Sequence, residues 1–231
     1  MVTTTAPSPR WTGRPRTTQE HVLAELRRRI LTGEVAPGDA IRPDVVAAEL
    51  AVSRVPVREA LKILEGEGQV DYRPHHGYTL AELRIDDLRE IYRLRELLEG
   101  EAVRVAVRRL DEGHLDEMRR ADDEMWGLDP GDRAGIAAMA IANRRFHFVP
   151  FEAAAMPHLL HVIDLLWNAT DHYRSVYYLD DADRRQVRAD HARIMKAARA
   201  RDGRALRAAM DEHRRHAIDG LWAHLEEETT T

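Results

Sequence analysis

The sequence predicts a mainly α-helical fold: a small N-terminal domain of short helices and a β-hairpin, then an antiparallel all-helical bundle of about six helices. Apolar residues recur at helical spacing over most of the chain. Only two short stretches, both before residue 81, alternate in the manner of strands. Glycine, proline and aspartate interrupt the helical pattern at intervals that suit tight turns between antiparallel helices.

The composition narrows the class of protein. The 231 residues allow one large or two ordinary domains, and 44% hydrophobic with 32% charged residues indicates a soluble, helix-rich chain with a real core. There is no cysteine, which excludes disulfides and thiolate metal sites. No apolar run approaches the ~20 residues of a membrane span, and the first residues lack the apolar core of a signal peptide. We therefore expect a cytoplasmic protein with no membrane partner.

The net charge of −5 argues against a protein that coats nucleic acid without sequence specificity, but the charge is unevenly distributed along the chain. Residues 1–80 carry 11 Lys+Arg and 10 Asp+Glu, whereas the rest of the chain carries 24 and 30. A small DNA-reading head on an acidic body is compatible with this asymmetry.

The N-terminal domain begins after a tail. Residues 1–16 are rich in Thr, Pro, Ser and Arg and are predicted to be disordered. Thr17 and Glu20 have the spacing of a capping box, which opens a helix over residues 19–31. A Pro-Gly turn follows, and then a second, short helix at 44–50.

The third helix, at 52–65, is the stretch on which the function depends. Ser53 suits the cap position, and Pro56 lies in the first turn, where its missing N–H costs nothing. Arg54 and Arg58 project from one face near the start of this helix. Two guanidinium groups there suit guanine O6 and N7 in the major groove, and solvated surface arginines are the alternative interpretation. The order of elements predicts a helix-turn-helix.

Two alternating stretches, 70–72 and 78–80, predict a β-hairpin that forms a wing. Its tip, His76-Gly77, can approach the minor groove or a phosphate, although ordinary exposed turn residues are the alternative. The domain at 17–80 is therefore predicted to be a winged helix-turn-helix that binds DNA.

A short linker at 81–86 leads to a second domain, 87–228, in which the pattern is helical almost throughout. Its helices are predicted at 86–111, 114–127, 131–154, 157–179, 182–201 and 203–227.

Four polar side chains in this bundle have spacings that predict one site. Asn143 and His147 are one helical turn apart and share a face. His191 lies 11 residues before Asp202 and His213 lies 11 residues after it, so an antiparallel pair that turns there places both imidazoles at one height. Three imidazoles and a carboxamide oxygen suit a borderline divalent metal with an open coordination position. Most of the 12 histidines must be solvated or structural, and His216, on the same face as His213, is the nearest such case.

The segments GEVAPGDAI, LAVSRVPVREALKILEGEGQV and HHGY closely resemble the winged helix-turn-helix of GntR-family bacterial transcription regulators, over residues 22–80. The resemblance implies DNA-contacting residues in the third helix and the wing: Ser53, Arg54, Val55, Pro56, Arg58, His76 and Gly77. Two residues depart from the family pattern. Ala51 replaces the usual glycine before the recognition helix, and Asp44 stands where some members have a DNA-contacting basic residue.

The segments NRRFH and DHARIMKAARARDGRALRAAMDEH resemble the FCD domain of FadR-type GntR regulators, over about residues 85–225. The resemblance implies an all-helical ligand-binding domain with a metal held by Asn143, His147, His191 and His213. Asparagine replaces the commoner aspartate and is a weaker ligand. Zinc is the first candidate, with nickel or manganese as alternatives.

The same resemblance implies a small carboxylic acid as effector. IYRLRELLEGEAV is similar to the first FCD helix, where an arginine faces the cavity, and this position is Arg95. Arg174 is a weaker second candidate, because a surface or ion-paired arginine is its more common state. Asp190, Asp211 or Glu212 can orient the imidazoles from outside the metal.

The leading interpretation is a homodimeric transcription regulator, not an enzyme. It is expected to act as a repressor on double-stranded palindromic operator DNA, with a small carboxylate effector modulating its affinity. Two alternatives are open at this point. One is a metal-dependent hydrolase or lyase that uses the three-histidine centre, and the other is a metal that only locks the bundle.

Overall fold

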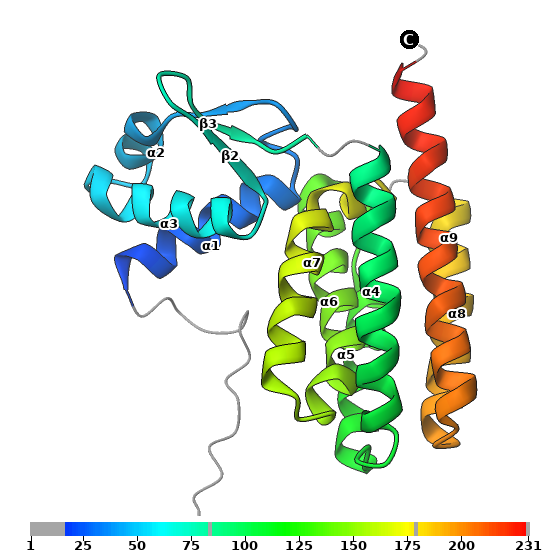
Figure 1. Cartoon of the computed structure of the whole chain (residues 1–231). Helices are drawn as coiled ribbons and strands as arrows, with labels where there is room; N and C mark the ends of the chain where they lie inside the picture. Colours follow the sequence, from blue (N-terminus) through cyan, green and yellow to red (C-terminus); the bar gives the residue numbers. More distant parts are fainter. Residues whose placement is uncertain (1–16, 83–84, 178–179, 230–231) are drawn as a thin grey trace, which may run out of the picture.

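The computed structural model describes residues 17–82, 85–177 and 180–229. The predicted tail at 1–16 lies outside the described residues. Figure 1 shows an N-terminal domain of short helices with a small sheet, beside one end of a bundle of long helices. The predicted fold class, a winged helix-turn-helix followed by an antiparallel helical bundle, is confirmed.

The N-terminal domain contains three helices and a three-stranded antiparallel sheet with the order β1-β3-β2. Its elements are α1 (Thr18–Leu31), β1 (Ala40–Ile41), α2 (Pro43–Glu49), α3 (Arg54–Gly66), β2 (Val70–Arg73) and β3 (Gly77–Leu80). The predicted hairpin pairs Tyr72 with Tyr78. Strand β1 was not predicted, because two residues are too few to show an alternating pattern.

Local sequence explains the ends and faces of these helices. Thr17 and Glu20 form the predicted capping box at the start of α1. The core beneath the sheet is closed by apolar side chains of α1, α3 and the strands, including Leu26, Leu61 and Val70, which are at most 1% exposed. This core holds α3 so that its opposite face points to solvent.

The bundle contains six helices in the described part of the chain, arranged antiparallel (Figure 1). They are α4 (Ile85–Ala106), α5 (Glu112–Gly127), α6 (Arg133–Ala153), α7 (Pro157–Tyr177), α8 (Asp181–Arg199) and α9 (Gly203–Thr229). Helix α4 begins inside the predicted linker at 81–86. None of the described helices is long and apolar enough to cross a membrane.

The two domains touch through α1. Leu31, at the end of α1, is buried in an apolar cluster with Met125 of α5, Ile136 of α6 and Val187 of α8. Beside it, Nη1 of Arg133 donates a hydrogen bond of 3.0 Å to a backbone carbonyl of the loop after α1. The N-terminal domain is therefore packed against the helices that carry the histidines.

Candidate functional sites

The first turn of α3 lies on the surface. Ser53 occupies the N-cap position as predicted, but its side chain makes no capping hydrogen bond. Val55 is 63% exposed, which is unusual for a valine in a short, well-packed domain. Arg54 and Arg58 are exposed, and Pro56 is half-buried. This exposed turn presents the two guanidinium groups on one side of the domain.

Arg54 has an acidic neighbour that the sequence did not link to it. Its Nε lies 2.9 Å from Oδ1 of Asp44, in the first turn of α2. Both side chains are more than half exposed, so the ion pair is weak. An arginine whose Nε is held by a carboxylate can still offer two terminal nitrogens to guanine.

The wing tip adopts a tight turn that requires left-handed backbone. His75 has φ of 68° and Gly77 has φ of 88°. His76, between them, is exposed, and its backbone N–H bonds to the carbonyl of Arg73 at 3.0 Å. The turn holds His76 and Gly77 at the end of the hairpin, away from the core.

The four predicted ligand residues come together inside the bundle. Asn143 and His147 lie on α6, His191 on α8 and His213 on α9. The Nε2 atoms of His147 and His213 are 3.1 Å apart, and Nε2 of His191 is 3.1 Å from Oδ1 of Asn143. One nitrogen from each of the three imidazoles lies within 4.8 Å of the others. Ligand atoms around a tetrahedral zinc ion are about 3.3 Å apart, so this donor set fits a metal of that size.

Two carboxylates orient the imidazoles from behind. Oδ1 of Asp122 lies 2.7 Å from Nδ1 of His191, and Oδ2 of Asp190 lies 3.3 Å from Nδ1 of His213. Each contact leaves the Nε2 atom directed at the centre, as in many metal sites. Asp190 is one of the three carboxylates predicted from the sequence to orient the imidazoles, whereas Asp122, 69 residues from His191 along the chain, is not among them.

Asp190 also accounts for the histidine that the sequence set aside. Nδ1 of His216 lies 2.9 Å from Oδ2 of Asp190, so this imidazole is held outside the centre. Burial opposes the charge on Asp190, but hydrogen bonds from His213, His216 and Arg193 lower its pKa well below the ordinary value. The other two candidates for orienting the imidazoles form ion pairs with arginines instead: Asp211 with Arg214 and Glu212 with Arg193.

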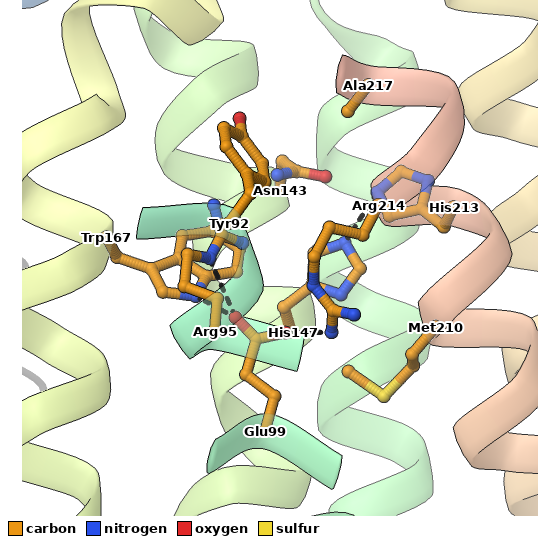
Figure 2. A pocket seen from close by; sticks show the side chains of 10 residues that line it. All are labelled: Tyr92, Arg95, Glu99, Asn143, His147, Trp167, Met210, His213, Arg214 and Ala217. Atoms are coloured by element: carbon orange, nitrogen blue, oxygen red, sulfur yellow. Dashed lines mark hydrogen bonds and ion pairs between the residues drawn. The ribbon is translucent and has the colours of Figure 1, made fainter. Parts of the chain in front are cut away.

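A small cavity opens beside the histidines, and Figure 2 shows the side chains that line it. Arg95 is buried there with its guanidinium carbon 4.2 Å from the ring centre of Trp167. Its Nε donates to Oε1 of Glu99 at 2.8 Å, and Arg214 from α9 donates to the other oxygen at 2.5 Å. The sequence placed Arg95 in this cavity but did not identify Glu99 or Arg214.

Glu99 is a buried carboxylate between two cations. Burial alone would raise its pKa, but Arg214 and Arg95 outweigh burial and lower the pKa to about 2. Nε1 of Trp167 adds a hydrogen bond of 2.7 Å to Oε1. The three charged groups therefore give the cavity wall a net charge of +1.

The second predicted effector residue cannot be placed. Arg174 lies on α7, but its side chain is outside the described part of the structure.

Comparison with known proteins identifies the family. Residues 18–80 match the family model described as bacterial regulatory proteins, gntR family, and residues 90–216 match the FCD domain. The chain belongs to the GntR family. It is 33% identical over 159 residues to a probable D-xylose utilization operon transcriptional repressor of Paenarthrobacter nicotinovorans, covering 67% of each chain.

Two further relatives match this GntR-family chain over most of its length. An uncharacterized HTH-type transcriptional regulator of Bacillus subtilis, YdhC, is 25% identical over 205 residues, covering 88% of this chain and 90% of the relative. The solved structure of Escherichia coli McbR/YncC superposes with a TM-score of 0.79 at 25% identity, covering 90% and 99% of the two chains.

Membership of the family decides between the broad classes of function. The chain is a DNA-binding transcription regulator and not an enzyme, so the hydrolase or lyase alternative is no longer supported.

Proposed function

We propose that this GntR-family regulator is a homodimeric repressor that reads a palindromic operator through α3 and senses a small carboxylic acid at a zinc-containing histidine centre. The observation that carries the proposal is the pairing of two features: exposed arginines at the start of α3, and three imidazoles that converge in the bundle, which contacts the same N-terminal domain through α1. As a DNA-binding regulator it is expected to work in the cytoplasm.

The reading of DNA rests on the geometry of α3. Arg54 and Arg58 are one turn apart on its exposed face, near the end that enters the major groove in helix-turn-helix proteins. A bidentate contact from arginine to guanine discriminates against other bases by about 1–3 kcal/mol. Ser53, Val55 and Pro56 would approach the bases or sugars beside them, and His76 and Gly77 would approach the neighbouring groove.

Mobility shifts with operator and random duplexes test this assignment. Arg54→Ala and Arg58→Ala should each weaken operator binding at least tenfold and reduce the preference over random DNA. Arg119→Ala, at an exposed arginine on α5, is the matched control and should bind like the parent. Unchanged operator affinity in both α3 variants contradicts the proposed reading head.

Dimerisation is supported by apolar side chains left on the surface of the bundle. Leu94 and Leu97, on one side of α4, are 41% and 48% exposed, and Val162 of the neighbouring α7 is 42% exposed. Burial of this surface against a second copy would give the two-fold symmetry that a palindromic operator mirrors. Sedimentation of a Leu94→Glu, Leu97→Glu double variant should show a monomer, and a persistent dimer excludes this face.

The repressor assignment follows the relative from Paenarthrobacter nicotinovorans, which is described as a probable D-xylose utilization operon transcriptional repressor. Activators share the architecture, so a reporter gene placed behind the operator decides the sign. Expression of the reporter should rise when the gene for this regulator is deleted.

The metal proposal rests on the donor set. Asn143, His147, His191 and His213 would hold the ion, with Asp122 and Asp190 fixing two of the rings. A bound ion would supply a positive charge and an open position for a carboxylate oxygen. Arg95 lies in the same cavity and would complement the rest of the acid's charge.

Thermal unfolding with and without zinc tests this centre. Metal-stripped protein should gain several degrees in Tm on addition of zinc, because an ion at ~100 times its Kd stabilises by about 2.7 kcal/mol. His191→Ala should lose the gain, and His216→Ala should keep it, because His216 lies outside the centre. Nickel and manganese in parallel identify the preferred ion, and an equal gain in His191→Ala contradicts the assignment.

Sensing and a purely structural metal differ in their effect on DNA. If the site senses, a small acid added to the zinc-loaded protein changes operator affinity by fivefold or more, the usual range of coupling between two sites. If acids raise Tm but leave operator affinity unchanged, the centre is structural.

A further inference from the structure

The cavity beside the histidines is small for a site that binds a whole carboxylic-acid effector. Its free volume is about 30 Å³, enough for one or two waters or a carboxylate group. Trp167, Met210 and Tyr92 close its apolar sides, and Figure 2 shows them packed around the two arginines. An acid larger than a few atoms therefore needs space elsewhere.

A second cavity, which we call the outer cavity, lies between α4 and α9. Its volume is about 230 Å³, and it shares Tyr92 and Arg214 with the inner one. These two side chains therefore form the boundary between the two spaces. By volume, the outer cavity holds about seven or eight waters, which equals an aromatic ring or a short alkyl chain.

The wall of the outer cavity combines apolar surface with a cationic rim. Ile218 and the indole of Trp222 provide apolar surface on α9. The guanidinium carbon of Arg89 lies 5.2 Å from the ring centre of Trp222, a cation–π contact that holds the indole in place. Arg93 pairs with Glu96 at 2.6 Å and Arg214 pairs with Asp211 at 2.8 Å, so the wall holds four arginines against two carboxylates, with Arg215 exposed at the rim.

We propose that the two cavities form one two-compartment effector site, which selects monocarboxylic acids that carry an apolar or aromatic group. The inference rests on the proposed function: the carboxylate occupies the inner compartment beside the histidines and Arg95, and the apolar group lies against Trp222 and Ile218. The arginines at the rim favour binding of the carboxylate anion over neutral or cationic analogues.

Calorimetry on the zinc-loaded full-length protein tests the proposal with three probes: acetate, phenylacetate and benzyl alcohol. Acetate should bind weakly through its carboxylate. Phenylacetate should bind about ten to a hundred times more tightly, the gain expected for burying one ring. Benzyl alcohol, which has the ring without the carboxylate, should not bind measurably.

Two variants locate the gain. Trp222→Ala and Ile218→Ala should each leave acetate binding unchanged and remove most of the advantage of phenylacetate. Val45→Ala, at an exposed apolar residue of α2 outside both cavities, is the control and should bind both acids like the parent. Because Trp222→Ala can affect folding, Ile218→Ala keeps the test decisive.

The outcomes separate this inference from the proposed function. Equal affinity for acetate and phenylacetate, or a phenylacetate advantage that survives both α9 substitutions, overturns the two-compartment site while acid sensing stands. If neither acid binds the parent protein, the proposed effector class fails, and the inference fails with it.

Discussion

Glu99 fixes the charge state of the inner cavity. Its pKa is about 2 in the fold, against an ordinary value of 4.5, because Arg214 and Arg95 outweigh the effect of burial. A lowered pKa means that ionised Glu99 stabilises the fold fully above about pH 4.5. This contribution, about 3 kcal/mol from the difference between the two values, is lost as the pH falls from about 4.5 toward 2.

Glu99→Gln should therefore lower the free energy of unfolding at pH 7 by about 3–5 kcal/mol, because two buried guanidinium groups lose their carboxylate. Urea titrations at pH 7, 4 and 3 measure this, and the difference from the parent should shrink as the pH falls. Glu101→Gln, at an exposed position of the same helix, is the control and should change little. A difference that stays constant with pH contradicts the role assigned to Glu99.

Asp44 should sharpen the reading of DNA by Arg54. The carboxylate restrains the arginine side chain, and it repels phosphates that would otherwise attract the guanidinium. Asp44→Ala should reduce the preference for the operator over a duplex in which the guanine contacted by Arg54 is replaced by another base. The expected reduction is up to about fivefold, the range of an exposed ion pair. Affinity for random DNA should rise.

A double-mutant cycle isolates this effect. In an Arg54→Ala background, Asp44→Ala should no longer alter the operator preference. If the loss of preference is the same in both backgrounds, Asp44 acts on DNA without Arg54.

Individual side chains differ in how far the sequence reveals them. The convergence of His191 and His213 follows from their equal distance along the chain from the turn at Asp202, because the helical rise per residue fixes the height of each side chain above that turn. Asp122 and Glu99 are not predictable in this way. Their partners His191 and Arg214 are 69 and 115 residues away, on helices whose neighbours and rotations depend on packing.

Most elements follow from periodicity and breaks, but their ends depend on caps. The first bundle helix was predicted at 86–111 and ends at Ala106. Asp111 caps the next helix through the backbone N–H of His114, so α5 starts earlier than the predicted residue 114. Asp111 and Gly113 are both plausible boundaries of this helix, and sequence pattern alone does not distinguish a cap from a glycine break two residues away.

The turn between α2 and α3 contains a local strain that the sequence indicated. Ala51 replaces the glycine expected there, and its φ is 53°, in the left-handed region. Ala51→Gly should stabilise the protein by about 0.5–1 kcal/mol, because relief of the side-chain clash exceeds the entropy that glycine adds to the unfolded chain. Operator affinity should not change.

Thermal unfolding of Ala51→Gly measures the gain as a rise in Tm of a few degrees. Ala48→Gly is the control on the same segment. Ala48 is exposed within α2, where glycine should lower stability by about 1 kcal/mol. A fall in Tm for both variants would show that the turn at Ala51 is not strained.

The two domains are joined by more than the chain that connects them, because the histidine centre and the DNA-facing domain share a continuous set of contacts. Oδ1 of Asp122 lies 2.7 Å from Nδ1 of His191 and accepts a hydrogen bond of 2.8 Å from Nε1 of Trp126. Trp126 packs against the apolar cluster that holds Leu31 of α1. A change in the position of His191 can therefore reach α1 through one carboxylate and one indole.

Trp126→Phe should uncouple the centre from DNA binding, because it removes the N–H that links the indole to the Asp122 carboxylate and keeps an aromatic ring in the cluster. Operator affinity of the metal-stripped variant should stay within about twofold of the parent. The ratio of operator affinities with and without zinc, expected to be fivefold or more in the parent, should fall toward one. Zinc must still raise the Tm of the variant, which shows that the centre itself is intact.

Leu31→Ala removes the other end of the same route and should reduce the ratio as well. If both variants keep the parent ratio, the centre communicates with α3 by a different path, such as a shift of the two protomers about their interface.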